Sequence, residues 1–454
     1  MDSVKRWTLV ASILGSSMAF IDGSVVNVAL HAIESDLGGG LAAQQWIVDA
    51  YLLTLGSLIL VGGSLGDIFG ELRMFTLGVA AFGVASVLCA AAPDSTTLIV
   101  FRGVQGVAGA LLTPASLAVI TSTFSGTERG AAIGTWTAWS GISFVIGPLV
   151  GGWLIGVSSW RIIFLINVPI ALVTVLLSLK LTGRRTDLRK DVRVDLPGAF
   201  LCAAGLGLLV AGFIEQPSLG WSNPLVPGGI AGGIVLLVAF VVYEMRARAP
   251  MLPLQLFRLR NFSVTNIETL SVYGGLSGLS VFLSLFLLEF AGYSPFRAGL
   301  ATLPITIVMF FLSRVAGRLS MQHGPHLFMA LGPIVAGVSL IPLARLPAHV
   351  NYWVDLLPPL LGFSVGLSMT VAPLTTTVLS DAGPGDAGIA SGVNNAIARV
   401  AGLVVVAVLG IAAAGGADNL TARGFHRSML IVCGLLIAGG LIGAVGIRNR
   451  PTAT

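Results

Sequence analysis

Long apolar runs separated by short polar stretches dominate the chain. A membrane-spanning helix needs about 20 mostly apolar residues, and fourteen runs meet this requirement. Two polar stretches, 183–195 and 246–261, divide them into groups of six, two and six. The pattern predicts an all-α integral membrane protein. The predicted spans are 7–30, 46–66, 73–92, 98–120, 131–156, 161–181, 196–214, 225–244, 262–288, 297–319, 327–345, 353–378, 387–413 and 426–446.

The order of the spans predicts three parts. They are an N-terminal six-helix half (1–182), a linker with two inserted transmembrane helices (183–261) and a C-terminal six-helix half (262–454). The halves share a repeat, since the segments 63–70 and 317–324 both fit G-x-L-x-x-x-x-G. Repeated halves are typical of transporters that rock about a central site.

Composition supports this prediction. Only 10% of the 454 residues are charged, and the mean hydropathy is +0.93, whereas a soluble domain has about 25% charged residues. The net charge of +5 does not indicate nucleic-acid binding, because all basic residues except Arg102 and Arg399 lie in the predicted loops or at the ends of the spans. With the N-terminus inside, the positive-inside rule is satisfied and both termini are cytoplasmic, in a multi-pass protein of the cytoplasmic membrane. Basic residues assigned to the outside are Arg161, Arg297, Arg345, Arg423 and Arg427.

Asp22 lies inside the first apolar run. An intramembrane carboxylate is costly unless it is protonated, paired or hydrated, so it is a functional candidate by default. Its predicted partner is Arg102, the only arginine within the fourth run. Desolvation opposes the aspartate anion and a nearby cation favours it, so Asp22 is a candidate proton carrier. The alternative is a fixed pair that only holds helices together.

Arg102, Gln105 and Gly109 recur at spacings that place them on one helix face, where glycine lets a helix or substrate approach the guanidinium. The alternative role for Arg102 is a structural donor to backbone carbonyls. In the fifth run, glycine pairs permit close helix contact and Pro148 predicts a kink. A kinked, closely packed helix can serve as a pivot or seal between the halves, although ordinary packing explains the glycines equally well.

Several motifs carry a family resemblance. They are Ile21 to His31; Trp46 and Tyr51; Gly63 to Arg73; Arg102 to Ala110; Gly141 with Gly147 to Gly152; Asn167-Val168-Pro169; Leu256-Phe257-Arg258; and Arg260-Asn261-Phe262. With these motifs the chain resembles the major facilitator superfamily, in its fourteen-spanner drug:proton antiporter branch. Ile68 and Glu71 depart from two basic positions of the family loop, which leaves the charge network of that loop open.

The resemblance implies a proton-coupled antiporter that exports small lipophilic compounds, cationic or amphipathic, by alternating access. The implied proton-coupling residues are Asp22, Arg102 and Glu268. The implied substrate-cavity residues are Asn27, Asp49, Gln105, Trp136, Asn394, Asn395 and Arg399. The implied gating residues are Asp67, Gly63, Gly70, Gly147, Pro148 and Gly151.

Several of these residues have a second interpretation. Glu268 is equally a helix-end carboxylate facing water, and Asp49 an exposed residue near the outer end of its span. Asn394, Asn395 and Arg399 line the cavity or only bond across helices. Trp136 is a stacking surface or an interface anchor. Asp67 either latches one conformation, as in the family, or lies in a plain loop turn.

No phosphate-binding G-x-x-x-x-G-K-[ST] motif occurs, so ATP is not the expected energy source. No metal-ligand set, cofactor motif or catalytic constellation is present, so the chain is not expected to be an enzyme. The expected partners are a small-molecule substrate, protons and the bilayer, with the chain acting as a monomer. Two rival functions remain: a dedicated exporter of one natural product or lipid, and a non-transporting scaffold or receptor.

Overall fold

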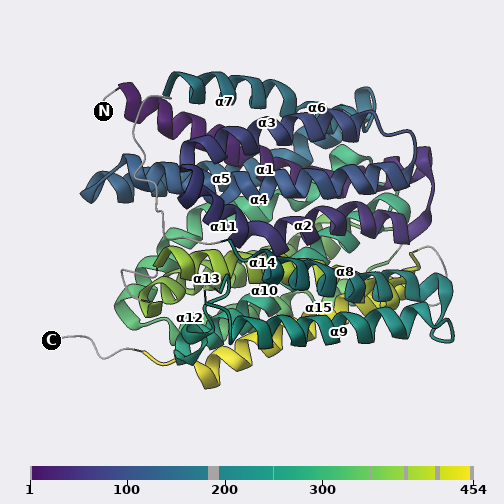
Figure 1. Ribbon diagram of the computed structural model, residues 1–454. Coiled ribbons are helices and arrows are strands. Elements are labelled where there is room, and N and C mark those ends of the chain that lie inside the picture. The colour runs from purple at the N-terminus through teal and green to yellow at the C-terminus, as the bar shows by residue number, and fades with distance from the viewer. Residues whose placement is uncertain are drawn as a thin grey trace. The chain divides into compact units, whose positions relative to one another are not determined.

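A computed structural model describes residues 3–181, 194–248, 250–347, 349–382, 387–414 and 420–449. Helices account for nearly all of the ordered secondary structure, and these residues contain no β strand (Figure 1). The helices up to residue 181 are α1 (Ser3–Leu37), α2 (Gly40–Phe69), α3 (Glu71–Ala90), α4 (Ser95–Thr123), α5 (Gly126–Val157), α6 (Ile162–Leu165) and α7 (Asn167–Leu181).

The remaining helices follow the first polar stretch. They are α8 (Leu196–Leu219), α9 (Leu225–Glu244), η1 (Leu254–Arg258), α10 (Arg260–Glu289), α11 (Pro295–His323), α12 (His326–Ser339), η2 (Ile341–Arg345), η3 (Tyr352–Leu356), α13 (Leu357–Ala382), α14 (Ala387–Ala414) and α15 (Ala422–Gly446).

Each of the fourteen predicted runs coincides with a helix or a pair of consecutive short helices. Among the described residues, thirteen helical segments are long and apolar enough to cross a membrane. The remaining predicted span is α5, of which the described apolar part is Ile146–Val157. The predicted all-α membrane fold is therefore confirmed, with the sixth span divided between α6 and α7 at Ile166.

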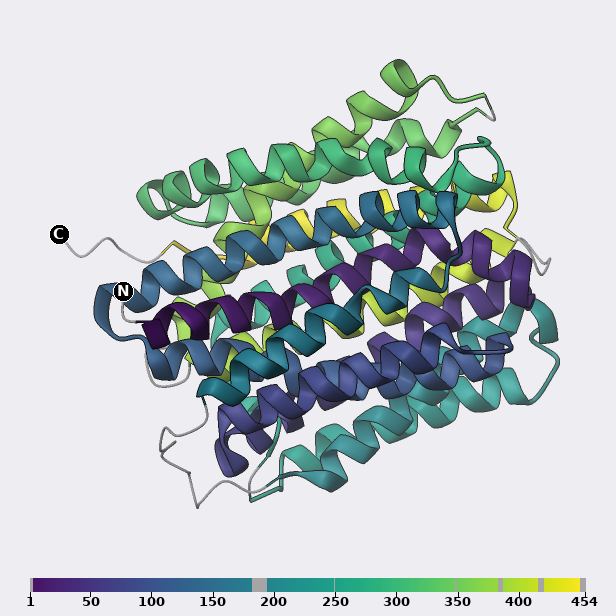
Figure 2. The same cartoon turned by 90° about the horizontal axis from the view of Figure 1, so that it is seen from above.

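The chain forms two compact units. The first contains residues 1–212, 227–252 and 294–297, and the second contains residues 213–226, 253–293 and 298–454. In the first unit α1 packs against α4, α5 and α7, and α2 and α3 pack against α4. Figure 2 shows α1 running alongside α5. In the second unit α10 packs against α14 and α15, and α12 packs against α13 and α15.

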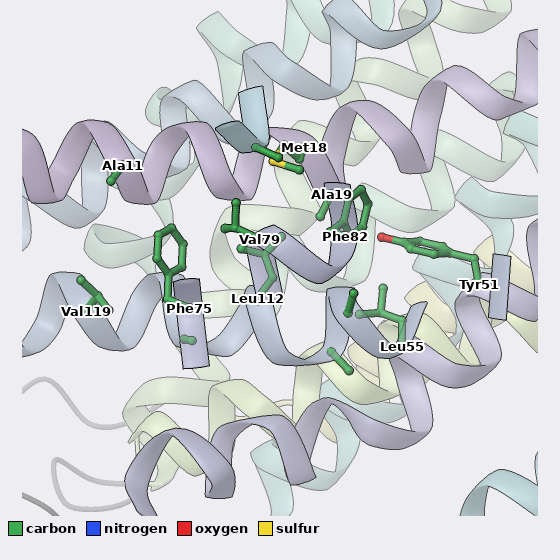
Figure 3. Packing of buried hydrophobic residues seen from close by; sticks show 14 residues of the cluster. Ala11, Met18, Ala19, Tyr51, Leu55, Phe75, Val79, Phe82, Leu112 and Val119 are labelled. Carbon is green, nitrogen blue, oxygen red and sulfur yellow. The ribbon is translucent and has the colours of Figure 1, made fainter. Parts of the chain in front are cut away.

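A cluster of buried side chains from α1, α2, α3, α4 and α7 forms the apolar core of the first unit (Figure 3). Phe75 and Phe82 of α3 reach towards Met18 of α1 and Leu112 of α4, and all four are fully buried. The Tyr51 ring of α2 meets Phe82 edge to face, with the ring centroids 6.4 Å apart. This packing fixes the four long helices that carry the polar residues described below.

Local sequence sets several helix boundaries. Asp94 caps α4, because its carboxylate accepts a hydrogen bond of 2.8 Å from the Thr97 backbone N–H. That backbone bond, together with one from the Thr97 hydroxyl, lowers the pKa of Asp94. The cap therefore stabilises the fold above the unfolded pKa of the carboxyl and is lost as the pH falls through the lowered value.

The segment from Gly63 to Gly70 differs from the sequence-based expectation. It was expected to form a loop, but α2 continues through it to Phe69, so Asp67 lies in the last turn of the helix, half-buried. The helix ends where Gly70 adopts a φ of 98°, a conformation that side-chain-bearing residues rarely adopt. The turn between α2 and α3 is therefore a single residue.

Helices α2 and α4 approach each other closely at two glycines. A Cβ atom on Gly106 would lie 2.1 Å from Thr54 Oγ1 and 2.4 Å from the Tyr51 carbonyl oxygen, and one on Gly62 would lie 2.0 Å from the Ala110 carbonyl oxygen. These distances leave no room for a methyl group. The Thr54 hydroxyl also donates to the Gly103 carbonyl over 2.8 Å, which ties the two helices together.

We expect Gly106→Ala to destabilise the protein by about 1–3 kcal/mol, because the added methyl group must push α2 and α4 apart. Thermal unfolding of the purified protein in detergent measures this effect. Gly103→Ala is the matched control on the same helix, since its Cβ would meet only the Thr54 methyl group at 3.9 Å. Equal melting temperatures for the two variants would contradict this account of the α2–α4 contact.

Candidate functional site

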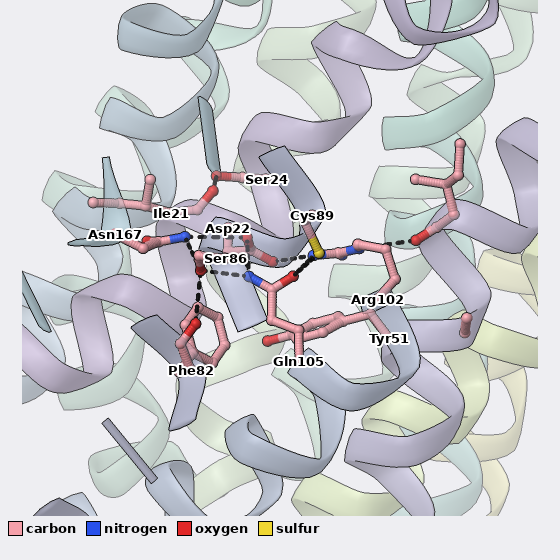
Figure 4. A network of polar contacts seen from close by, with 12 residues as sticks. Ile21, Asp22, Ser24, Tyr51, Phe82, Ser86, Cys89, Arg102, Gln105 and Asn167 are labelled. Carbon is pink, nitrogen blue, oxygen red and sulfur yellow. Dashed lines mark hydrogen bonds and ion pairs between the residues drawn. The ribbon is translucent and has the colours of Figure 1, made fainter. Parts of the chain in front are cut away.

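A buried ion pair joins α1 to α4. Arg102 Nη1 donates to Asp22 Oδ2 over 2.5 Å, and the two side chains are 2% and 0% exposed. Such a pair is desolvated, so its stability depends on further hydrogen bonds to both partners. The structure supplies these bonds from several helices, as Figure 4 shows.

Gln105 connects both members of the pair. Its Nε2 donates to Asp22 Oδ1 over 2.9 Å, while its Oε1 accepts from Arg102 Nη1 over 2.6 Å. Gln105 lies one helical turn after Arg102, so its single amide group can form hydrogen bonds with both charged side chains. The predicted Asp22, Arg102 and Gln105 are therefore brought together.

Two further polar residues, for which the sequence predicted no role, join the network, and the Cys89 thiol donates to Gln105 Oε1 over 3.5 Å. Asn167, at the start of α7, donates from Nδ2 to Asp22 Oδ1 over 3.3 Å and to Ser86 Oγ over 3.2 Å. Ser86 also accepts from Gln105 Nε2 over 3.0 Å and donates its own hydrogen to the Phe82 carbonyl over 2.8 Å. The sequence offered one signal for these two residues, since each is a polar residue in an otherwise apolar span. Asn167 also belongs to the Asn167-Val168-Pro169 motif.

The Arg102 guanidinium is held on its other side by α2 and α6. Its Nε donates to the Ile47 carbonyl over 3.0 Å. The guanidinium carbon lies 4.4 Å from the centre of the Tyr51 ring and 5.7 Å from that of Phe164, within the range of cation–π attraction. Asp22 accepts three donors from α4 and α7, and all the groups that hold Arg102 are buried.

Helix α5 contacts α1 beside Asp22. A Cβ on Gly147 would lie 2.1 Å from Ser24 Oγ and 2.9 Å from the Ile21 carbonyl oxygen, and one on Gly151 would lie 2.1 Å from Val25 Cγ2. The α1 turn that carries Asp22 therefore lies directly on the glycine face of α5. The predicted gating residue Pro148 lies between these glycines, half-buried and inside the helix.

Two predicted acidic residues lie outside this network. Asp49 of α2 is fully buried, and neither of its carboxylate oxygens has a hydrogen-bond partner among the described residues. Glu268 of α10 is also fully buried without a described partner, and its Oε2 lies 3.0 Å from the place of a Cβ on Gly443 of α15. The structure thus buries both carboxyl groups, although water exposure was an alternative for each.

The remaining predicted cavity residues have varied surroundings. Asn394 donates to Asn266 Oδ1 over 3.0 Å and to Thr269 Oγ1 over 2.7 Å, which joins α14 to α10. Trp136 Nε1 donates to Ser16 Oγ over 2.8 Å. Asn395 is exposed and donates from Nδ2 to the Ser391 carbonyl over 3.0 Å, while Asn27 is buried and Arg399 is half-buried.

The network has a definite chemical capacity. The three side chains that bond to the Asp22 carboxyl group are all hydrogen-bond donors. Asp22 is the only carboxylate among the described members of the network, and an arginine does not lose its proton in proteins. A proton arriving there can therefore bind only to Asp22, and it must displace a donor. No group of three or more His, Cys, Asp or Glu side chains suited to a metal ion occurs among the described residues.

Sequence comparison identifies one family over most of the chain. The sequence model of the Major Facilitator Superfamily matches residues 12–407. The puromycin resistance protein of Streptomyces alboniger is 34% identical over 100% of this chain and 93% of that protein. The methylenomycin A resistance protein of Bacillus subtilis is 33% identical over 89% of this chain and 86% of that protein.

A third relative and two solved structures extend the comparison. The tetracenomycin C resistance and export protein of Streptomyces glaucescens is 32% identical over 89% of this chain and 75% of that protein. The fold is similar to that of a D-xylose–proton symporter, with a TM-score of 0.70 and 14% identity over 98% of this chain and 99% of that one. A peptide transporter in complex with sulfate also has a TM-score of 0.70, at 14% identity over 96% and 93% of the two chains.

We expect Arg102→Met and Asp22→Asn to respond differently to pH. In Arg102→Met the buried Asp22 lacks its cation but can take up a proton, so the variant should regain stability as the pH falls to about 5. In Asp22→Asn the uncompensated charge is on Arg102, which cannot neutralise. Its loss of stability, about 3 kcal/mol, should not change over this range. Thermal unfolding at several pH values measures both.

The double variant Asp22→Asn/Arg102→Met provides the control, since it removes both charges. It should be more stable than Asp22→Asn alone. A double variant less stable than both single variants would show that the pair contributes through shape and not through charge.

Proposed function

Because the chain belongs to the Major Facilitator Superfamily, whose members are membrane transporters and not enzymes, we propose that it exports small lipophilic drugs, cationic or amphipathic, in exchange for protons. The names of three relatives, which refer to resistance to puromycin, methylenomycin A and tetracenomycin C, support the export of antibiotics or similar drugs. The chain acts as a monomer in the cytoplasmic membrane with both termini in the cytoplasm.

The buried Asp22–Arg102 pair carries this proposal. A carboxylate that is fully buried in membrane-spanning helices and held by three donors is a costly arrangement for a purely structural contact. It is suited to a group that changes its protonation state during a cycle, because each change breaks or restores several bonds at once. The proton in the name of the D-xylose–proton symporter refers to that protein alone and does not support this proposal.

The proposed cycle follows from the chemistry of the pair. When Asp22 is open to the outside it takes up a proton, which removes its charge and weakens its bond to Arg102. The released guanidinium and the amides of Gln105 and Asn167 then reorient, and the unit changes its packing. On the cytoplasmic side Asp22 loses the proton and the network re-forms, which is coupled to the uptake of substrate. Glu268 is a second candidate for proton exchange.

The proton gradient provides sufficient energy for such export. Moving one charge through about 100 mV yields about 2.3 kcal/mol. Since about 1.4 kcal/mol corresponds to a tenfold ratio, one proton sustains a roughly fifty-fold gradient of a neutral substrate.

The proposed substrate cavity combines aromatic surface with isolated polar groups. Asn27, Asp49, Gln105, Trp136, Asn394, Asn395 and Arg399 are its candidate lining residues. Asp49 is the candidate counter-charge for a cationic substrate, since its buried carboxyl has no described partner. A bound organic cation would supply the missing charge.

The proposed gate is the α1–α5 contact. Its second element is the end of α2, with Gly63 and Asp67 inside the helix and Gly70 at the α2–α3 turn. Gly147 and Gly151 let α5 slide against the α1 turn that carries Asp22, and Pro148 interrupts the backbone hydrogen bonds of α5. A change at Asp22 is thereby transmitted to α5 through the adjoining α1 residues Ile21, Ser24 and Val25.

A dedicated exporter of one natural product is the second candidate function. It is favoured by the relatives' names, three of which each refer to a single antibiotic. Drug panels distinguish the two candidates, since a dedicated exporter responds to one chemical class.

We expect Asp22→Asn to abolish substrate-triggered proton release from everted membrane vesicles that carry an imposed proton gradient and a pH-sensitive dye. Lipophilic cations and antibiotics are added one at a time. Asp36→Asn is the matched control, because Asp36 lies on the same helix in an exposed ion pair of 2.5 Å with Arg161, a class of contact that contributes little. The control should retain wild-type proton release.

Equal release from Asp22→Asn and wild type would place the proton site elsewhere, and Glu268→Gln is then the next variant. Substrate transport by the wild type without proton release would contradict antiport itself.

We expect Gly147→Ala to reduce transport at least tenfold, because the added methyl group displaces the α1 turn that carries Asp22. Gly156→Ala on the same helix is the control, since a Cβ there would meet no atom within 4 Å. Drug efflux from cells that express equal amounts of each variant measures the effect. A Gly147→Ala protein that transports as fast as Gly156→Ala would rule out the α1–α5 contact as a gate.

A further inference from the structure

Two buried carboxyl groups that the proposed transport cycle does not use lie at the ends of α8 and α9. Asp195 immediately precedes α8, and its Oδ1 accepts from the Gly198 backbone N–H over 2.9 Å. Glu244 is the last residue of α9, and its Oε2 accepts from the Leu252 backbone N–H over 2.9 Å. Asp195 is 6% exposed and Glu244 is 3% exposed.

The second oxygen of each carboxyl group faces the other carboxyl group. A Cβ on Gly198 would lie 2.5 Å from both Asp195 Oδ2 and Glu244 Oε1. Neither of these oxygens accepts a hydrogen bond from a described residue. The absence of a side chain at Gly198 therefore allows two carboxyl groups to meet out of water.

No ion pair among the described residues neutralises these two carboxyl groups. The described titratable groups nearest the pair are the Tyr243 phenol, which is within hydrogen-bond reach of the Asp195 carboxyl group, and the Cys202 thiol. Both are neutral near pH 7. Two ionised carboxylates in contact repel strongly, and such pairs share one proton. That proton would also make the hydrogen bond that both oxygens lack.

We propose that Asp195 and Glu244 form a second proton-binding site, separate from Asp22, in which one shared proton joins the start of α8 to the end of α9 and holds residues 245–252 against them. The site is independent of the transport function proposed above. Loss of the shared proton leaves two facing anions, which separates the helix ends and releases Leu252 from Glu244.

The position of the site gives it a role in the linker. Leu252 ends the stretch 227–252 of the first unit. From Pro253 the chain continues through η1 to α10. The shared proton therefore fixes the point from which the chain leaves the inserted helices. A rise in the pH at this end of α8 and α9 would free that segment.

Hydrogen–deuterium exchange of the full-length protein in lipid nanodiscs tests this inference. Peptides that cover residues 194–200 and 245–254 report on the Gly198 and Leu252 N–H groups. The rates are converted to protection factors, which removes the intrinsic effect of pH. In the wild type we expect protection of both peptides to fall about tenfold between about pH 6 and about pH 9, as one hydrogen bond is lost.

Amide variants give the discriminating result. In Glu244→Gln and in Asp195→Asn, one amide N–H takes the place of the shared proton at every pH, so protection should stay high and independent of pH. In the double variant Asp195→Asn/Glu244→Gln two amide groups meet, and at least one is left poorly paired. Its protection should be low throughout. Glu215→Gln, at the other end of α8, is the control and should behave like the wild type.

Wild-type protection that does not change with pH would overturn the proposal. Equal protection in the double variant and the single variants would also overturn it, because no shared hydrogen would then be needed. Transport activity does not enter either comparison, so a failure of the proposed function leaves this result intact.

Discussion

The structure of the first unit depends on the pairing of Arg102, which keeps its positive charge, with Asp22, whose negative charge a proton can neutralise. Arg102 remains a cation wherever it lies, so burying it in apolar helices requires Asp22, the Ile47 carbonyl and the rings of Tyr51 and Phe164 around it. These groups come from three segments of the chain, α1, α2 and α6. The arginine therefore ties α1, α2 and α6 to α4, and the apolar core of Figure 3 packs α1, α2, α3, α4 and α7 against one another.

Glycines allow the helices of this unit to pack closely against one another. Where α2 meets α4 and where α5 meets α1, a hydrogen atom in place of a side chain lets one helix backbone lie directly on the next. In a membrane, where lipid is as apolar as the protein, such close contact is a main source of helix association. Asp22 and the residues that meet Gly147 and Gly151 of α5 lie on the same turns of α1.

The sequence predicted the all-α membrane fold and the Asp22–Arg102–Gln105 cluster, because charge in an apolar run is rare and a helical turn places residues 102 and 105 together. It did not predict Ser86 and Asn167, since many spans contain one serine or asparagine and spacing alone does not show which face meets another helix. The extension of α2 through Asp67 was missed because glycines suggested a loop, while the helix ends only where Gly70 takes a positive φ. Asp195 and Glu244 lie 49 positions apart (244 − 195), and only the packing of α8 on α9 reveals that they meet.

The hydrogen bonds through Ser86 have one direction. Its hydroxyl gives its only hydrogen to the Phe82 carbonyl, so it accepts from Gln105 and Asn167 and cannot donate to Asp22. The donors that Asp22 does have are a guanidinium and two amides, none of which gives up its proton readily. In the proposed cycle the proton therefore comes to Asp22 from water. The path that water takes to α1 would then set the side of the membrane with which the proposed site equilibrates.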